Sequence, residues 1–132
     1  MILGVPKEIL NNETRVAVIP STVKQLISAG FEVIIESGAG SLSQISDDDY
    51  LNVGAKIINN TSEVYNNSDM ILKVNSPTDD ELSMIKENSS YLSFFQTMKE
   101  VEKVKIFKNK NITGFSMHLI PRTTLAQKMD AL

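Results

Sequence analysis

Short apolar runs alternate with helix-like segments along most of the chain. Runs rich in Val, Ile, Leu and Phe, bounded by polar or glycine-containing stretches, are typical of buried strands in a parallel sheet. Such runs predict strands at residues 2–5, 31–36, 55–58, 69–74, 91–95 and 113–117.

Helical start and stop signals lie between these runs. We expect Ser21 and Ser46 to cap two helices, and Gly30 and Gly54 to end them. Three consecutive Asp residues after Ser46 suit the positive end of a helix. The expected helices cover residues 22–29, 47–53, 61–68, 76–85 and 98–107. In the last of these, Met98, Val101, Val104 and Phe107 recur every three residues as an apolar stripe.

Strands that alternate with helices at this spacing predict an α/β fold with a doubly wound, mainly parallel sheet and helices on both faces. Every connection is long enough for the crossover that parallel strands require. The 132 residues correspond to one such unit, Rossmann-like or flavodoxin-like. The last stretch, "IPRTTLAQKMDAL" at 120–132, also reads as the start of a helix but carries no stop signal, so we expect the polypeptide to continue beyond Leu132.

Composition excludes several functional classes. The net charge of −3, with acids and bases mixed along the chain, argues against nucleic acid or an anionic membrane as the main partner. The chain has no cysteine and one histidine, so it offers neither a disulfide framework nor an obvious zinc site. No signal peptide and no membrane-spanning run is recognisable. We expect a soluble, cytoplasmic domain without a metal.

Polar residues follow several of the predicted strands, at the edge where open α/β sheets collect ligands. Arg15, Lys73, Gln96 and Arg122 occupy such positions, and we expect them to converge on one crevice. Lys73 is the most unusual, because an ammonium near the end of an apolar strand is costly without a partner.

Arg15 and two other features of the chain also have less specific interpretations. Arg15 is equally consistent with a simple pair with Glu13 two residues earlier. His118, the single histidine, is more often structural than catalytic in such a setting. The "ESGAGS" stretch at 36–41 is not G-x-G-x-x-G, so it predicts a turn rather than a dinucleotide loop.

Four stretches make a specific resemblance: "GVPKE", "NETRVAVIPSTVKQLISAGFEVIIESGAG", "ILKVNSPTDDEL" and "IPRTTLAQKMDAL". They resemble the start of the α subunit of proton-translocating NAD(P) transhydrogenases, in the alanine dehydrogenase/transhydrogenase N-terminal domain family. The resemblance implies that residues 1–132 are the N-terminal subdomain of an NAD(H)-binding domain. A second, Rossmann subdomain with the glycine fingerprint would follow residue 132.

The resemblance also implies a site. Arg122, Gln127 and Asp130 match the residues that surround the nicotinamide of NAD(H) in that family, with Gln127 in the catalytic role of aligning the nucleotides. On a helix, Gln127 and Asp130 would share a face. The expected reaction is hydride transfer between NAD(H) and NADP(H), with NADP(H) held by a separate domain or β subunit, coupled to proton translocation.

Alanine dehydrogenases share the first part of this resemblance and are the alternative. That family implies an Arg and a Lys that hold a keto acid, matched by Arg15 and Lys73, and a His for proton transfer, matched by Gln96. Glutamine does not titrate, whereas transhydrogenation moves no proton between its reactants. This difference favours transhydrogenation and leaves Arg15 and Lys73 as possible ligand contacts.

The resemblance further implies partners: a membrane domain, the NADP(H)-binding domain and a second copy in a homodimer. The expected place is the cytoplasmic side of the bacterial inner membrane, reached through these partners. A third alternative is a non-catalytic interaction fragment. Residues 1–132 alone lack the glycine turn that receives the pyrophosphate, so we expect them to bind NAD⁺ weakly or not at all.

Overall fold

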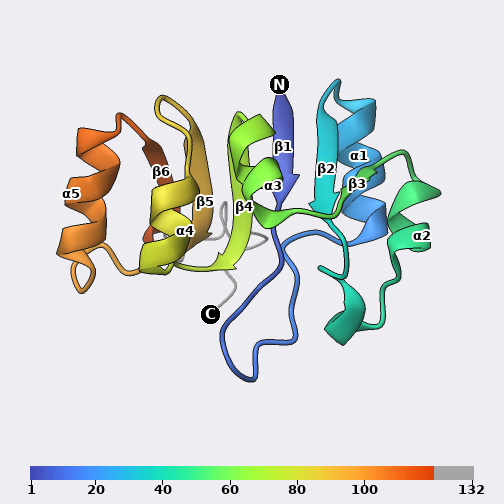
Figure 1. Cartoon of the computed structure of the whole chain (residues 1–132), viewed down its shortest axis with the longest axis horizontal. Coiled ribbons are helices and arrows are strands. Elements are labelled where there is room, and N and C mark those ends of the chain that lie inside the picture. The colour runs from blue at the N-terminus through green and yellow to red at the C-terminus, as the bar shows by residue number, and fades with distance from the viewer. Residues whose placement is uncertain (121–132) are drawn as a thin grey trace.

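The computed structural model describes residues 1–120, which fold as a parallel sheet covered by helices (Figure 1). Each strand boundary lies within one residue of the boundary predicted from the apolar runs. The strands are β1 (Ile2–Val5), β2 (Glu32–Glu36), β3 (Lys56–Ile58), β4 (Met70–Asn75), β5 (Ser90–Phe94) and β6 (Thr113–Ser116).

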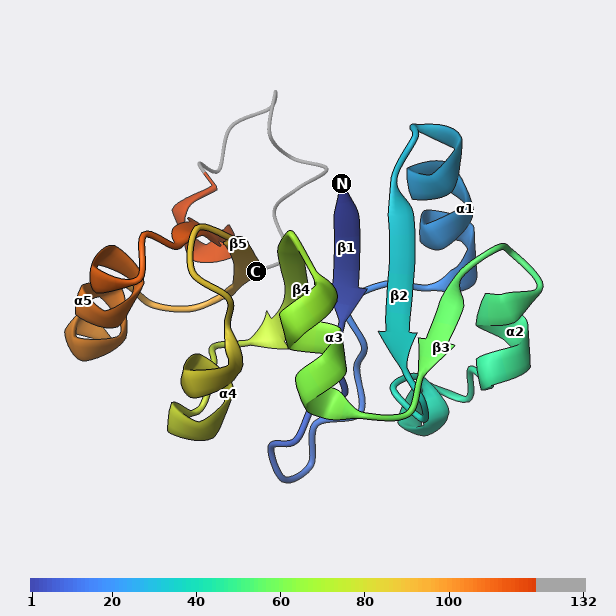
Figure 2. The ribbon, with the colours of Figure 1, turned by 45° about the horizontal axis from the view of Figure 1, so that its top comes forward.

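The strand order is β3-β2-β1-β4-β5-β6, and every neighbouring pair is parallel. This is the order of a doubly wound dinucleotide-binding sheet, although the chain lacks the glycine fingerprint. The order reverses between β1 and β4, which lie side by side in the middle of the sheet (Figure 2). Ligands of such sheets bind outside the carboxyl ends of the strands at this switch point.

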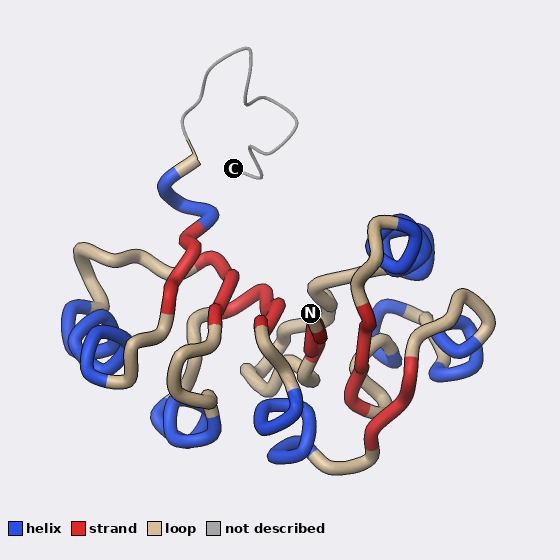
Figure 3. The backbone as a smooth tube through the Cα atoms, turned by 90° about the horizontal axis from the view of Figure 1, so that it is seen from above, coloured by secondary structure: helices blue, strands red, loops and turns tan. Residues whose placement is uncertain are grey.

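Helices cover both faces of the sheet, as predicted (Figure 3). Helices α1 and α2 pack on one face beside β1, β2 and β3, and α3, α4 and α5 lie on the other. Their bounds are α1 (Pro20–Ser28), α2 (Asp47–Leu51), α3 (Thr61–Asn67), α4 (Asp79–Met84) and α5 (Val101–Asn109). Two short 3₁₀ turns occur at Ser41–Ser43 and Met117–Leu119.

The helix starts show one confirmed cap and one error. Ser46 caps α2 in a capping box with Asp49, as the sequence indicated. The predicted cap at Ser21 is wrong, because Ile19 holds the N-cap position and Pro20 opens the helix. Proline suits the first helical position, since its fixed φ is helical and its missing N–H is not needed there.

The predicted helix at 98–107 is also partly wrong. Helix α5 begins only at Val101, and Met98 lies before it with 90% of its surface exposed. The turn before the helix is closed by Glu100, whose carboxylate accepts the Gln96 backbone N–H at 2.9 Å. Of the apolar stripe, Phe107 alone is buried, against Tyr91 and Phe95.

Two separate apolar cores flank the sheet. One joins α1 and α2 to β1 and β2, and centres on Val5, Val23 and Ile35. The other joins α3, α4 and α5 to β4 and β5. A cavity of about 650 Å³ lies where the first core meets β4 and β5, lined mainly by apolar side chains, among them Leu72 and Phe94.

The glycine-containing loop after β2 is a turn, as predicted. Gly38 adopts a φ of 81°, which favours glycine. Its N–H donates to Asp47 Oδ1 at 2.9 Å, and the Ser37 hydroxyl donates to Asp47 Oδ2 at 2.6 Å. A carboxylate of the chain itself therefore occupies the donors that a phosphate would need.

Candidate functional site

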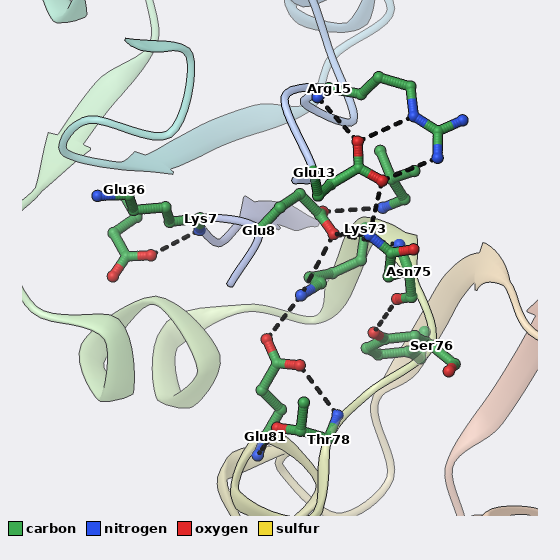
Figure 4. Close-up of polar contacts among 12 residues, drawn as sticks. Lys7, Glu8, Glu13, Arg15, Glu36, Lys73, Asn75, Ser76, Thr78 and Glu81 are labelled. Atoms are coloured by element: carbon green, nitrogen blue, oxygen red, sulfur yellow. Dashed lines mark hydrogen bonds and ion pairs between the residues drawn. The ribbon is translucent and has the colours of Figure 1, made fainter. Parts of the chain in front are cut away.

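An irregularity at the end of β4 creates the polar centre of the switch point. Between Leu72 and Asn75, β4 uses one residue more than the facing stretch of β5. Such a bulge takes backbone N–H groups out of the strand ladder. Glu8, which follows β1, receives them: its Oε2 accepts the Val74 N–H at 2.9 Å and its Oε1 accepts the Asn75 N–H at 3.1 Å (Figure 4).

Lys73 lies within this bulge and is almost fully buried. Its Nζ lies 2.6 Å from Glu81 Oε2 and 3.5 Å from Glu8 Oε1. Tyr65 donates its hydroxyl to the same Glu81 oxygen at 3.0 Å. Burial, and then the nearby Glu81 charge, raise the pKa of Tyr65 above its usual range, so its hydroxyl keeps the proton that it donates. Lys73 thus has the partner that the sequence required, and its role as a ligand contact stays a prediction.

Glu81 is placed by the start of α4. Thr78 and Glu81 form a capping box, in which each side chain accepts the backbone N–H of the other. The box fixes the Glu81 carboxylate directly across from Lys73. One carboxylate therefore serves both the helix start and the buried ion pair.

Arg15 and Glu13 form the outer part of the site. Arg15 Nε donates to Glu13 Oε2 at 3.0 Å and Nη2 donates to Oε1 at 2.8 Å. The Arg15 hydrogen bonds lower the pKa of Glu13 to about 2, so the carboxylate stays charged. The pair with Glu13, which was one of the interpretations that the sequence left open for Arg15, is present. The Arg15 side chain is 66% exposed and lines the 650 Å³ cavity.

Asn75 joins the inner and outer parts. Its Nδ2 donates to Glu8 Oε1 at 3.1 Å and to Glu13 Oε1 at 2.9 Å. Its backbone oxygen accepts the Tyr91 hydroxyl at 3.1 Å. A continuous set of polar contacts therefore runs from buried Lys73 to exposed Arg15 (Figure 4).

A second, smaller cavity of about 310 Å³ adjoins the first, and Phe94 lines both. Gln96 and His118 line it together, and the His118 ring meets the Phe94 ring edge-on, with centroids 5.9 Å apart. Glu100, also in its wall, is engaged by Ser76 and by the Gln96 N–H. Within residues 1–120 the side chains of Gln96 and His118 have no hydrogen-bond partner.

The expected convergence is partly met. Arg15 and Lys73 line the larger cavity and Gln96 lines its neighbour. Arg122, Gln127 and Asp130 lie outside the described residues. Sequence reasoning missed Glu8, Asn75 and Glu81. The Thr-x-x-Glu spacing at 78–81 could have revealed Glu81, whereas nothing in the sequence marks Glu8 or Asn75 as polar partners.

Neither a metal site nor a membrane-spanning helix is found between residues 1 and 120. This part of the chain contains no group of three or more His, Cys, Asp or Glu side chains arranged to hold a metal ion. It also contains no helix that is long and apolar enough to cross a membrane.

The family model described as "Alanine dehydrogenase/PNT, N-terminal domain" matches residues 4–132. An NAD(P) transhydrogenase subunit alpha of Haemophilus influenzae is 42% identical over 132 residues, which are 100% of this chain and 25% of the relative. An alanine dehydrogenase of Methanococcus maripaludis is 38% identical over 120 residues, 91% of this chain and 32% of the relative. This chain therefore spans only a quarter to a third of those relatives.

A solved structure of a transhydrogenase from Sinorhizobium meliloti superposes on this fold with a TM-score of 0.92 at 35% identity. The match covers 98% of this chain and 37% of that one.

Proposed function

Because the chain belongs to the alanine dehydrogenase/PNT N-terminal domain family, we propose that it forms one wall of the NAD(H) cleft in an NAD(P) transhydrogenase alpha subunit. The reaction is hydride transfer between NAD(H) and NADP(H), coupled in the whole assembly to proton translocation. The transhydrogenase relative that matches this chain over its full 132 residues supports this choice.

The state of Lys73 is the observation that carries the proposal. A keto-acid site of the alanine dehydrogenase kind needs Lys73 free beside Arg15 to hold the substrate, and a group that transfers a proton. The Lys73 ammonium is 1% exposed and held 2.6 Å from Glu81. A keto acid would have to displace that carboxylate and leave it buried without its cation, which is costly. The residue at position 96 is a glutamine, which carries no proton for catalysis.

Hydride transfer makes different demands. Two nicotinamides must be held close, at roughly 3–3.5 Å between the reacting atoms, with water excluded. We assign the alignment of the NAD(H) nicotinamide to Gln127, with Arg122 and Asp130 as its other contacts. A carboxamide both donates and accepts hydrogen bonds, so an acid, an amide and a guanidinium together satisfy it.

The remaining parts of the proposal come from the family. A second, Rossmann subdomain after residue 132 supplies the glycine turn for the pyrophosphate. NADP(H) binds to a separate domain or β subunit, and a membrane domain carries the proton path. The intact alpha subunit forms a homodimer on the cytoplasmic side of the bacterial inner membrane.

Two assays on the intact protein test the proposal. We expect NADH-dependent reduction of an NADP⁺ analogue in the assembled enzyme and no oxidation of NADH by pyruvate with ammonia. Gln127→Asn shortens the amide arm, and a ~1 Å misplacement costs on the order of 100-fold in rate. We expect this loss in hydride transfer with little change in NADH affinity. Arg122→Ala is expected to weaken NADH binding instead. A Gln127→Asn rate within about twofold of wild type would remove Gln127 from the site.

One observation favours the alternative, an alanine dehydrogenase-like oxidoreductase. His118 shares the smaller cavity with Gln96, so a titratable group lies close to the position where that reaction needs one. If His118 replaces the missing histidine, the intact protein oxidises NADH with pyruvate and ammonia, and His118→Asn abolishes that activity. Strong turnover in this assay would overturn the transhydrogenase proposal.

A further inference from the structure

Arg15 lies on a long connection with little regular structure. Residues 6–19 join β1 to α1, and their apolar side chains Ile9 and Leu10 are largely exposed. Asn12 turns the chain with a φ of 65°. A guanidinium on such a segment keeps a fixed direction only if side-chain contacts tie it to the sheet.

Asn75 is the sheet residue that makes this tie. Its backbone N–H is held by Glu8 and its backbone oxygen by the Tyr91 hydroxyl, so the residue is fixed from two sides. Both contacts use main-chain atoms and do not depend on its side chain. The carboxamide nitrogen is then shared between the Glu8 and Glu13 carboxylates, at 3.1 and 2.9 Å.

Glu13 links Asn75 to Arg15 and fixes the direction of the Arg15 side chain. Its side chain is 10% exposed, and its two oxygens grip the Arg15 Nε and Nη2 groups in a fork. Such planar pairs set direction as well as distance. The guanidinium has further N–H groups that Glu13 does not engage, and no other hydrogen-bond acceptor within residues 1–120 contacts them.

We infer that Asn75 is a positioning residue for Arg15: its carboxamide ties the buried Glu8 carboxylate to Glu13 and so directs the guanidinium into the cavity mouth, toward an anionic oxygen of the bound dinucleotide. The part concerning the dinucleotide rests on the proposed function. The positioning of Arg15 by Asn75 does not.

Asn75→Ala in the intact protein tests the inference, because it removes the carboxamide contacts and leaves the two backbone contacts in place. The first measurement is the rate at which phenylglyoxal modifies Arg15, followed by mass spectrometry of the peptide that contains it. The second is NADH affinity by calorimetry, in the wild-type and Arg15→Ala backgrounds. Asn66→Ala, a change of an exposed asparagine in α3, is the matched control.

We expect Asn75→Ala to speed the modification of Arg15 and to raise the Kd for NADH roughly tenfold, the loss typical of one hydrogen bond to a charged group. In the Arg15→Ala background, Asn75→Ala should add no further loss, because its effect acts through Arg15. If transhydrogenation is measurable, KM for NADH rises while kcat stays unchanged. The Asn66→Ala protein should match wild type in each measurement.

Three results would overturn the inference. An unchanged rate of Arg15 modification in Asn75→Ala shows that the carboxamide does not fix the guanidinium, whatever the enzyme does. An unchanged NADH affinity shows that the fixed guanidinium does not serve the dinucleotide. An equal loss of affinity in both backgrounds shows a general structural role for Asn75. Absent transhydrogenation with the expected reactivity and affinities intact would refute the proposed reaction and leave the positioning role standing.

Discussion

At two places on the carboxyl edge of the sheet, a carboxylate accepts hydrogen bonds from a strand end, but only one of the two is linked to an exposed charged side chain among the residues that the structure describes. After β2, the Asp47 carboxylate accepts the Gly38 N–H and the Ser37 hydroxyl. At the end of β4, the Glu8 carboxylate accepts the N–H groups of Val74 and Asn75. In both places a carboxylate from another segment accepts a backbone N–H at, or just beyond, the end of a strand.

The two carboxylates differ in the further contacts that each one makes. In the described part of the chain, the Asp47 side-chain contacts extend no further than the Gly38 N–H and the Ser37 hydroxyl, and they reach no exposed cation. The Glu8 contacts continue through Asn75 and Glu13 to a guanidinium at the surface. A glycine-rich loop is therefore weak evidence for an anion site until the partners of its N–H groups are known, whereas an anchored, exposed cation is stronger evidence.

The largest expected effect concerns the buried ion pair between Lys73 and Glu81. Glu81→Ala leaves the Lys73 ammonium with a single, more distant carboxylate and removes the partner of the Tyr65 hydroxyl. Breaking a buried ion pair typically costs about 3–5 kcal/mol. We expect a loss of that size in the free energy of unfolding, measured by urea titration with circular dichroism. Glu87→Ala, an exposed change nearby, should stay within about 0.5 kcal/mol of wild type. A loss below about 1 kcal/mol for Glu81→Ala would show that the pair is not buried in solution.

A smaller effect is expected at the loop after β2, which contains Ser37 and Gly38. Asp47→Ala leaves the Gly38 N–H and the Ser37 hydroxyl without their charged acceptor, at a cost of about 1–3 kcal/mol in unfolding free energy. NADH affinity and Arg15 reactivity should change less than in Asn75→Ala, because this loop reaches the Glu13–Arg15 segment through a different contact, the Ser43 hydroxyl that donates to the Thr14 backbone oxygen. Asp48→Ala is the matched control: it also removes a charge from the first turn of α2 but touches no loop donor. Equal losses for both variants would assign the effect to the helix start alone.

The smallest effect concerns the outer pair and pH. Arg15 holds the pKa of Glu13 at about 2, below its usual value of 4.5. A lowered pKa in the folded state means that the contribution of Glu13 to stability is present above pH 4.5 and is lost as the pH falls toward 2. Arg15→Ala should return the Glu13 titration midpoint toward 4.5, measured by carboxyl NMR, and change the unfolding free energy by less than about 1 kcal/mol. An unmoved midpoint would mean that the hydrogen bond from Asn75, and not the pair with Arg15, lowers the pKa of Glu13.

The sequence predicted the strands well because most of them contain a short run of Val, Ile, Leu or Phe bounded by polar or glycine residues. The sequence failed to predict the starts of two helices. The apolar stripe from Met98 predicted a helix start three residues earlier than the start of α5, because Glu100 closes a turn there first. It also placed the cap of α1 at Ser21, where Pro20 makes a start without any side-chain bond.

The site divides in the same way. The Arg15–Glu13 pair was predictable because the two residues lie close together in the chain. Lys73 was recognisable because a charge in an apolar strand needs a partner. The Glu8–Asn75 contact joins residues 67 positions apart and depends on a one-residue bulge that no periodicity announces. Contacts of this kind require the folded sheet.

The strand pairing at the switch point has a consequence for the order of folding. β1 pairs with β2 over four residues, but with β4 over the two pairs Leu3–Met70 and Gly4–Ile71, next to the contacts of Ile2 with Asp69. Side-chain packing crosses this seam more extensively than the strand ladder does, since Leu72 of β4 packs against the core around Val5 and Ile35. The ladder at the seam should therefore form after the other ladders of the sheet, because it is short and joins more distant segments. The Val74 and Asn75 amides, held by Glu8 from across the seam, should exchange their hydrogens whenever this ladder opens.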